Sequence, residues 1–340
     1  MSGSLLLLFV FLSAFLAPPL SRLLRMPVPV GELVIGLLLG HFLAQGVALP
    51  EILGFLADFG FLLLMFLAGL EVDFNLLRQL ERRHFVFYAL YVVGMFLGAG
   101  LLAGLLGVGL AQALILALVS IGLMVATLRD MGILGRAFAK RVLILGVLGE
   151  VASLFGLTAM EKAAHYQGLL SLLKEVGIIA LFFLLLFLAF RLAGLFLWWY
   201  PEVGRRLVYE EDPSAMGIRL SLALMFAAAV MSGLVGLESV LGAFLAGMIL
   251  SYFLQKKHDL EAKLSAMGYG FLIPIFFIRT GMGIDLSGLD GRLLLEVGQA
   301  LLLMLLIRLL PAPFRQAGGP RRGAALLAAP LPAPAFRLRV

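Results

Sequence analysis

Residues 141–157 read ArgValLeuIleLeuGlyValLeuGlyGluValAlaSerLeuPheGlyLeu, an apolar run with one acid, Glu150, in its middle. We expect Arg141 at a membrane–water interface, and the nine residues of helix that follow, at about 1.5 Å each, place Glu150 roughly 13–14 Å deeper. That depth is close to the centre of a hydrocarbon core about 30 Å thick, where a carboxylate is costly. We therefore predict that Glu150 faces a protein interior or a water-filled path and is functional. The alternative is a neutral glutamic acid hydrogen-bonded within a helix bundle.

The composition places the rest of the chain in the membrane as well. Of the 340 residues, 62% are hydrophobic and 14% charged, and the mean hydropathy is +1.09, which predicts an all-α polytopic membrane protein. The absence of cysteine excludes disulfides and thiolate chemistry, and the four histidines show no paired metal-ligand spacing. The isoelectric point near 9.8 does not indicate a nucleic-acid partner, because the basic residues lie in short loops.

About eleven transmembrane spans are predicted from the apolar runs. The first run lacks a basic n-region and a small-residue cleavage site, so we interpret it as a retained helix. The spans cover residues 4–20, 28–45, 51–73, 84–107, 109–128, 141–160, 175–200, 217–235, 237–253, 264–286 and 293–311.

The basic residues of the connecting loops predict the orientation of the chain. Three lie in the even-numbered loops: Lys162, Lys174 and Arg292. Fifteen lie in the odd-numbered loops: Arg22, Arg25, Arg78, Arg82, Arg83, Arg129, Arg136, Lys140, Arg141, Arg205, Arg206, Arg219, Lys256, Lys257 and Lys263. Because basic loops stay in the cytoplasm, we expect the N-terminus outside and the C-terminus inside the cell inner (plasma) membrane.

An internal repeat is visible in the apolar segments. Residues 60–73, GlyPheLeuLeuLeuMetPheLeuAlaGlyLeuGluValAsp, match residues 270–285, GlyPheLeuIleProIlePhePheIleArgThrGlyMetGlyIleAsp, at both ends. Upstream of each, residues 31–40 resemble residues 238–247. Spans three and ten run in opposite directions, so the sequence predicts inverted repeats, which in secondary transporters hold the substrate site near the membrane midplane.

A second repeat matching the first would need thirteen spans. Residues 312–340 form a Pro/Ala/Arg-rich tail without an apolar run of roughly 20 residues, and we expect this tail to be disordered. The last two helices of the repeat are therefore expected to be missing. Backbone groups at any break in span five would then lack partners.

Polar residues within the other spans are the remaining candidates. Ser120, Gly122 and Thr127 of span five indicate either a helix break that can hold a cation or a small-residue packing face. Arg279 and Arg308 are intramembrane bases that either neutralise an acid or interact with the backbone, and Arg308 alternatively snorkels to the inner interface. A separate group of acids is assigned structural roles: Glu32 and Asp58 to packing, and Glu71 and Asp73 to pairing with Arg78.

Three motifs resemble the monovalent cation:proton antiporter-2 family over residues 1–311. They are PheLeuLeuLeuMetPheLeuAlaGlyLeuGluValAsp (61–73), LeuGlyAlaPheLeuAlaGlyMetIleLeu (241–250) and PhePheIleArgThrGlyMetGlyIleAsp (276–285). The resemblance implies a dimeric, thirteen-helix elevator exchanger. It assigns a scaffold to residues of about 1–75 and 217–286 and a moving core to about 84–166 and 293–311.

The same resemblance implies roles for individual residues. Glu150 takes the place of the acid that binds the proton or the cation, although Gly149 replaces the polar or acidic residue that precedes it in the family. Ser120 and Thr127 lie on the helix that is unwound in the family. A basic residue of the family falls on Arg308, which would compensate charge together with Arg279.

We therefore expect Na⁺/H⁺ or K⁺/H⁺ antiport by alternating access. Glu150 would hold either a proton or the cation, in a homodimer that needs no cofactor and is not an enzyme. A potassium efflux system and a truncated, transport-inactive membrane protein are the alternatives. An intramembrane hydrolase is disfavoured, because the sequence shows no Ser–His pairing and no paired intramembrane aspartates.

Overall fold

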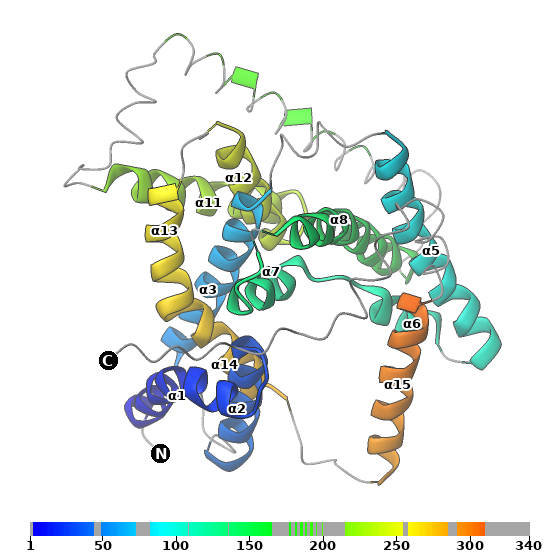
Figure 1. The fold of residues 1–340 in the computed structure, drawn as a ribbon, viewed down its shortest axis with the longest axis horizontal. Coiled ribbons are helices and arrows are strands. Elements are labelled where there is room, and N and C mark those ends of the chain that lie inside the picture. Colours follow the sequence, from blue (N-terminus) through cyan, green and yellow to red (C-terminus); the bar gives the residue numbers. More distant parts are fainter. Residues whose placement is uncertain are drawn as a thin grey trace. The chain divides into compact units, whose positions relative to one another are not determined.

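The computed structural model describes residues 3–43, 49–72, 82–107, 109–134, 136–164, 215–253, 258–284 and 291–309, with single residues between 177 and 199. Within these ranges every regular element is a helix, as the sequence predicts (Figure 1). Span seven, apart from those single residues, and the tail 312–340 lie outside the described part of the chain.

The helices follow the predicted spans closely. They are α1 (Gly3–Leu23), α2 (Val28–Leu43), α3 (Glu51–Leu70), α5 (Arg82–Leu106), α6 (Leu110–Ala117), α7 (Ile121–Asp130), α8 (Ala137–Ala164), α11 (Met216–Leu234), α12 (Ser239–Phe253), α13 (His258–Met267), η1 (Gly268–Leu272), α14 (Ile273–Met282) and α15 (Gly291–Leu309). Five described helical stretches are long and apolar enough to cross a membrane: Gly3–Leu23, Glu51–Leu70, Val86–Leu105, Met216–Leu234 and Leu260–Met282. The chain is a multi-spanning membrane protein.

Two predicted spans differ from the observed helices. Span ten, predicted at 264–286, begins earlier, because α13, the π-helical turn η1 and α14 run on continuously from His258 to Met282. Span five, predicted as one segment, is two helices, α6 and α7, separated by residues 118–120. Of the two interpretations that the sequence left open for span five, the structure therefore has the break.

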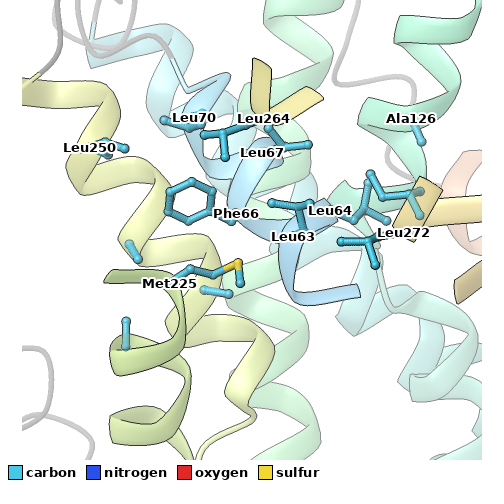
Figure 2. Close-up of a cluster of buried hydrophobic side chains, with 14 of the residues drawn as sticks. Leu63, Leu64, Phe66, Leu67, Leu70, Ala126, Met225, Leu250, Leu264 and Leu272 are labelled. Atoms are coloured by element: carbon cyan, nitrogen blue, oxygen red, sulfur yellow. The ribbon is translucent and has the colours of Figure 1, made fainter. Parts of the chain in front are cut away.

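Helix α3 lies at the centre of the larger apolar core. Residues 63–70 of this helix are all buried, so α3 contacts other helices rather than lipid on most sides. Figure 2 shows Phe66 and Leu67 of α3 beside Met225 of α11 and Leu264 of α13. Lipid tails are as apolar as leucine, so close packing rather than removal from water stabilises this core.

Glycines allow α3 and α12 to approach each other closely. A Cβ atom on Gly69 of α3 would collide with the carbonyl oxygen of Phe244 in α12. Reciprocally, a Cβ atom on Gly247 of α12 would collide with the carbonyl oxygen of Phe66 in α3. Small residues at such crossings are typical of membrane helices whose backbones touch.

The same reciprocal contact occurs between α2 and α14. A Cβ atom on Gly36 of α2 would collide with the carbonyl oxygen of Ile278, and one on Gly281 of α14 with that of Leu33. The two helix pairs therefore use one glycine-to-carbonyl arrangement twice, with segments that are far apart in the sequence.

The chain groups into two compact units. One contains Met1–Gln79 and Leu118–Val297, and the other contains Leu80–Ala117 and Gly298–Val340. Helices α7 and α8 both belong to the first unit, together with α3, α12 and α13. The predicted division into scaffold and core concerns motion between conformations and stays a prediction.

Candidate functional site

Residues 118–120, the break between α6 and α7, lie against one face of α8. Gly146, Gly149, Glu150 and Ser153 are spaced by three, four and seven residues, which places them on one side of a helix. A Cβ atom on Gly149 would lie 2.9 Å from Cβ and Cγ2 of Val119, closer than such atoms normally come. Glycine at position 149 is thus what allows the backbone of the break to lie against α8.

Two side chains on this face accept hydrogen bonds from the break. The backbone N–H of Ile121 donates to Oε2 of Glu150 at 3.0 Å, and the backbone N–H of Val119 donates to Oγ of Ser153 at 2.9 Å. Between them, Ser120 has an extended backbone, with φ −110° and ψ 111°, and its own side chain does not cap α7. Groups that a helix break would leave unpaired are therefore satisfied by α8.

One contact of Glu150 favours a negative charge on its carboxyl, namely the hydrogen bond from the Ile121 N–H at the start of α7. The N-terminus of a helix carries a partial positive charge, and a carboxylate that accepts a backbone N–H there is stabilised. Glu238, just before α12, is close enough to interact electrostatically with Glu150 and has the same sign of charge when ionised. A proton or a small cation on Glu150 would relieve that repulsion, so the surroundings suit an exchangeable positive charge.

The structure brings Ser120 to Glu150 but places Thr127 elsewhere. Ser120 is the N-cap residue of α7 and precedes the residue whose N–H binds Glu150. Thr127 lies in the last turns of α7, where its carbonyl accepts the N–H of Met131. At about 1.5 Å per residue, six helical positions separate Thr127 from Ile121 by roughly 9 Å.

The two predicted bases lie on other helices. Arg279 is in the last turn of α14, and its Nη1 would be 3.5 Å from a Cβ atom on Gly283, so its guanidinium folds towards the end of its own helix. Arg308 is in the last turn of α15, in the second compact unit, where its carbonyl accepts the Tyr91 hydroxyl at 3.0 Å. Their charge-compensating roles remain proposals.

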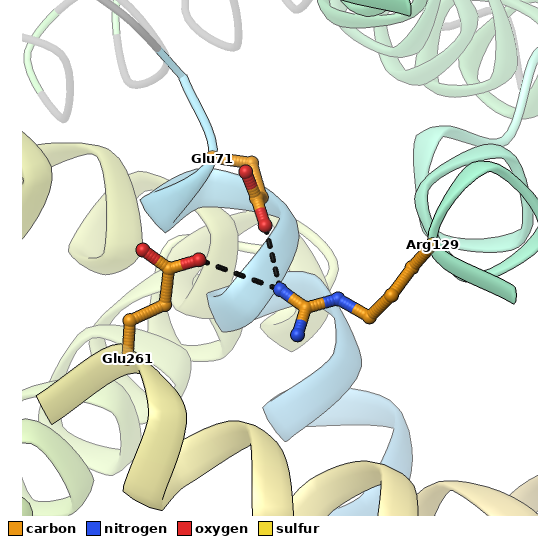
Figure 3. Close-up of polar contacts among 3 residues, drawn as sticks. All are labelled: Glu71, Arg129 and Glu261. Atoms are coloured by element: carbon orange, nitrogen blue, oxygen red, sulfur yellow. Dashed lines mark hydrogen bonds and ion pairs between the residues drawn. The ribbon is translucent and has the colours of Figure 1, made fainter. Parts of the chain in front are cut away.

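An ion-pair cluster that the sequence did not predict holds the other end of α7. Nη2 of Arg129 is 2.6 Å from Oε1 of Glu71, after the end of α3, and 3.4 Å from Oε1 of Glu261 in α13 (Figure 3). The guanidinium also lies over the ring of Tyr269, 4.8 Å from its centroid. Glu71 was expected to pair with Arg78, which lies outside the described residues, and its observed partner is Arg129.

Glu71 lies just outside the membrane-spanning part of α3. Burial raises the pKa of its carboxyl, and the neighbouring Glu261 raises this pKa further, whereas Arg129 acts in the opposite direction. At the next position of α7, the carboxylate of Asp130 accepts the backbone N–H of Val28 at 3.0 Å. The C-terminal end of α7 is therefore fixed to α2, α3 and α13.

These features together define a class: a multi-spanning membrane protein in which a broken helix meets an acid-bearing helix. The family model described as "Sodium/hydrogen exchanger, transmembrane" matches residues 11–329. The chain belongs to this sodium/hydrogen exchanger family. The resemblance to the monovalent cation:proton antiporter-2 family is thereby confirmed.

Three relatives illustrate the range of the family. YjbQ of Bacillus subtilis is 27% identical over 91% of this chain and 52% of its own length. The Na⁺/H⁺-K⁺ antiporter GerN of Bacillus cereus is 27% identical over 84% of this chain and 72% of its own. The glutathione-regulated potassium-efflux system protein KefC of Klebsiella pneumoniae is 26% identical over 93% of this chain and 51% of its own. The chain thus spans about half the length of YjbQ and KefC.

Proposed function

We propose that this chain exchanges Na⁺ or K⁺ for protons at Glu150. The observation that carries the proposal is the hydrogen bond from the Ile121 N–H to one carboxylate oxygen of Glu150 at a helix break. Among the contacts of the described residues, that bond occupies Oε2 and leaves Oε1 of the same carboxylate for a proton or a cation. Because one oxygen cannot hold both, occupancy by either excludes the other and couples the two fluxes.

The surroundings of Glu150 supply what such a site needs. The N-terminus of α7 stabilises the carboxylate once its proton has left, and carbonyl groups freed at the break are suitable ligands for a cation. Ser120 lies at this break. Thr127, further along α7, and the bases Arg279 and Arg308, on other helices, stay proposed members of the ion pathway rather than neighbours of Glu150. No covalent step is involved, so we propose a transporter rather than an enzyme, without a resident cofactor.

The proposed architecture is an inverted repeat of about eleven spans. Support comes from the matched glycine contacts, because exchanging α3 for α14 and α12 for α2 converts one contact pair into the other. We further propose elevator-type alternating access between the scaffold and core parts, a homodimer, and an extracytoplasmic N-terminus. The fifteen-to-three distribution of loop basic residues supports that orientation.

Two alternatives remain. A potassium efflux system is supported by the match to a protein named for potassium efflux. A transport-inactive membrane protein is the other alternative, and it predicts no cation-driven proton flux. Both differ from the main proposal in the fluxes they predict.

Reconstitution of the whole chain separates these possibilities. Proteoliposomes with a pH-sensitive dye inside should acidify or alkalinise when an Na⁺ or K⁺ gradient is applied. Glu150→Gln should abolish the proton movement without loss of folded protein, and Glu150→Asp should retain part of it with a changed apparent cation affinity. Potassium flux without proton flux would favour the efflux system, and unaltered exchange in the Gln variant would remove Glu150 from the mechanism.

A further inference from the structure

Ser153 occupies a defined place at the helix break. It is 6% exposed and lies one turn after Glu150 on the same face of α8. Its hydroxyl oxygen accepts the N–H of Val119, a residue 34 positions earlier in the chain. The bond therefore joins the break to α8 rather than closing a local turn.

The two hydrogen bonds at the break have matched geometry. Ser120 is extended, so the N–H groups of Val119 and Ile121, two residues apart, point to the same side of the backbone. Glu150 and Ser153, three residues apart, project from one side of α8. Two donors therefore meet two acceptors in register, one pair through Glu150 and one through Ser153.

We propose that Ser153 is a positioning residue for ion exchange at Glu150. Ser153 accepts the Val119 N–H, so Glu150 accepts only the N–H of Ile121 from the break. The other carboxylate oxygen of Glu150 therefore stays available for the exchanged ion. This inference rests on the proposed function of Glu150. It adds a residue of this chain that sets how strongly the site holds its cation.

The consequence of losing the hydroxyl follows from the cost of an unpaired buried donor. Without Ser153 Oγ, the Val119 N–H has to find another acceptor, and the Glu150 carboxylate is one turn away on the same helix face. A carboxylate that accepts both N–H groups has both oxygens engaged. A cation then has to displace one of these bonds, and its apparent affinity falls.

The test compares Ser153→Ala with Ser153→Thr, which keeps the hydroxyl. Ser221→Ala is the matched control, because Ser221 is also buried but its hydroxyl donates to the Gly217 carbonyl within α11. In proteoliposomes of the whole chain, Ser153→Ala should raise the KM for Na⁺ or K⁺ about tenfold, with a maximal rate within about twofold of the unaltered chain. The Thr and control variants should keep the original KM.

Hydrogen–deuterium exchange supplies a readout that does not depend on transport. With Na⁺ or K⁺ at saturating concentration, peptides covering residues 118–121 should exchange about tenfold faster in Ser153→Ala, because the cation displaces the replacement hydrogen bond from the Val119 amide to Glu150, and should be unaffected in Ser153→Thr and Ser221→Ala. Unchanged exchange at these residues in Ser153→Ala overturns the inference whatever the transport result.

The transport arm separates the inference from the proposed function. If Glu150→Gln abolishes exchange while Ser153→Ala keeps the original KM, the function stands and the positioning role is wrong. If Glu150→Gln leaves exchange intact, the proposed function and the positioning role both fail. A Ser153→Thr variant that behaves like Ser153→Ala also contradicts the inference, because the hydroxyl is then irrelevant.

Discussion

Replacing Gly149 with alanine tests whether the break depends on its close fit to α8. The added Cβ would lie 2.9 Å from Cβ and Cγ2 of Val119 and 3.1 Å from its Cγ1. Because valine is β-branched, these atoms have little rotamer freedom and the strain passes to the backbone. Overpacking of this kind typically costs about 1–3 kcal/mol.

The same displacement should weaken the site itself. Moving Val119 away from α8 also moves Ile121, and its 3.0 Å bond to Glu150 has little room to lengthen. We therefore expect Gly149→Ala to lower the apparent melting temperature in detergent and the apparent cation affinity together. The measurements are thermal unfolding of the purified chain and cation-dependent proton flux.

Gly146→Ala is the matched control on the same face of α8. Its Cβ would lie 3.1 Å from Sδ of Met124, a flexible side chain that can move aside, and 3.3 Å from Cγ1 of Ile121, a contact milder than the 2.9 Å contacts at Gly149. The combination of Gly149→Ala with Val119→Ala should recover part of the stability, because it removes Cγ1 and Cγ2 of Val119 and leaves only the contact with its Cβ. Equal effects of Gly149→Ala and Gly146→Ala, with no recovery in the double variant, would refute the reasoning.

Four further outcomes are expected. Arg129→Ala should destabilise the protein by about 2 kcal/mol, because Glu71 and Glu261 lose their shared partner, and an unchanged melting temperature would contradict this. Folding raises the pKa of Glu71, so the unaltered chain should lose stability as pH rises above about 4.5 and this carboxyl ionises. Glu71→Gln has no such carboxyl and should therefore become more stable relative to the unaltered chain over the same pH rise. A stability difference that stays constant across pH would contradict this. With a single acid at the exchange site, transport should move one proton per cation, so that an imposed membrane potential does not drive it. Reporter fusions after Arg206 and after Lys257 should both be cytoplasmic, and a periplasmic signal from either would reverse the proposed orientation.

The sequence predicted the features that follow from hydropathy. Membrane spans appear as apolar runs whatever their neighbours, so helix positions were largely correct within a few residues. Glu150 stood out for the same reason, since a lone acid in such a run is conspicuous. The variants Glu150→Gln and Glu150→Asp test whether Glu150 is the exchange site.

The contacts between distant segments could not be predicted in the same way. Arg129 meets Glu71 and Glu261 across 58 and 132 residues, and local spacing cannot indicate which acid a base will reach. We expected backbone groups at the break to lack hydrogen-bond partners without a crossing helix, and this was wrong for the N–H groups of Val119 and Ile121. Side chains of α8 accept both hydrogen bonds instead. A serine one turn after Glu150 was the available signal, but buried serines usually bond within their own helix, as Ser21 and Ser221 do here.

The proposed internal repeat illustrates how packing adds information that an alignment of apolar segments lacks. The sequence match of 31–40 with 238–247 pairs Gly40 with Gly247, because leucine and glycine recur in both segments. The contacts instead make Gly36 equivalent to Gly247, since each of these two glycines lies against a carbonyl oxygen of the facing helix in the same reciprocal arrangement. Many registers of two apolar helices look alike in sequence, but few let backbones touch at a glycine on both sides. Backbone contact at these glycines is therefore a stricter guide to the register of the repeat than residue similarity.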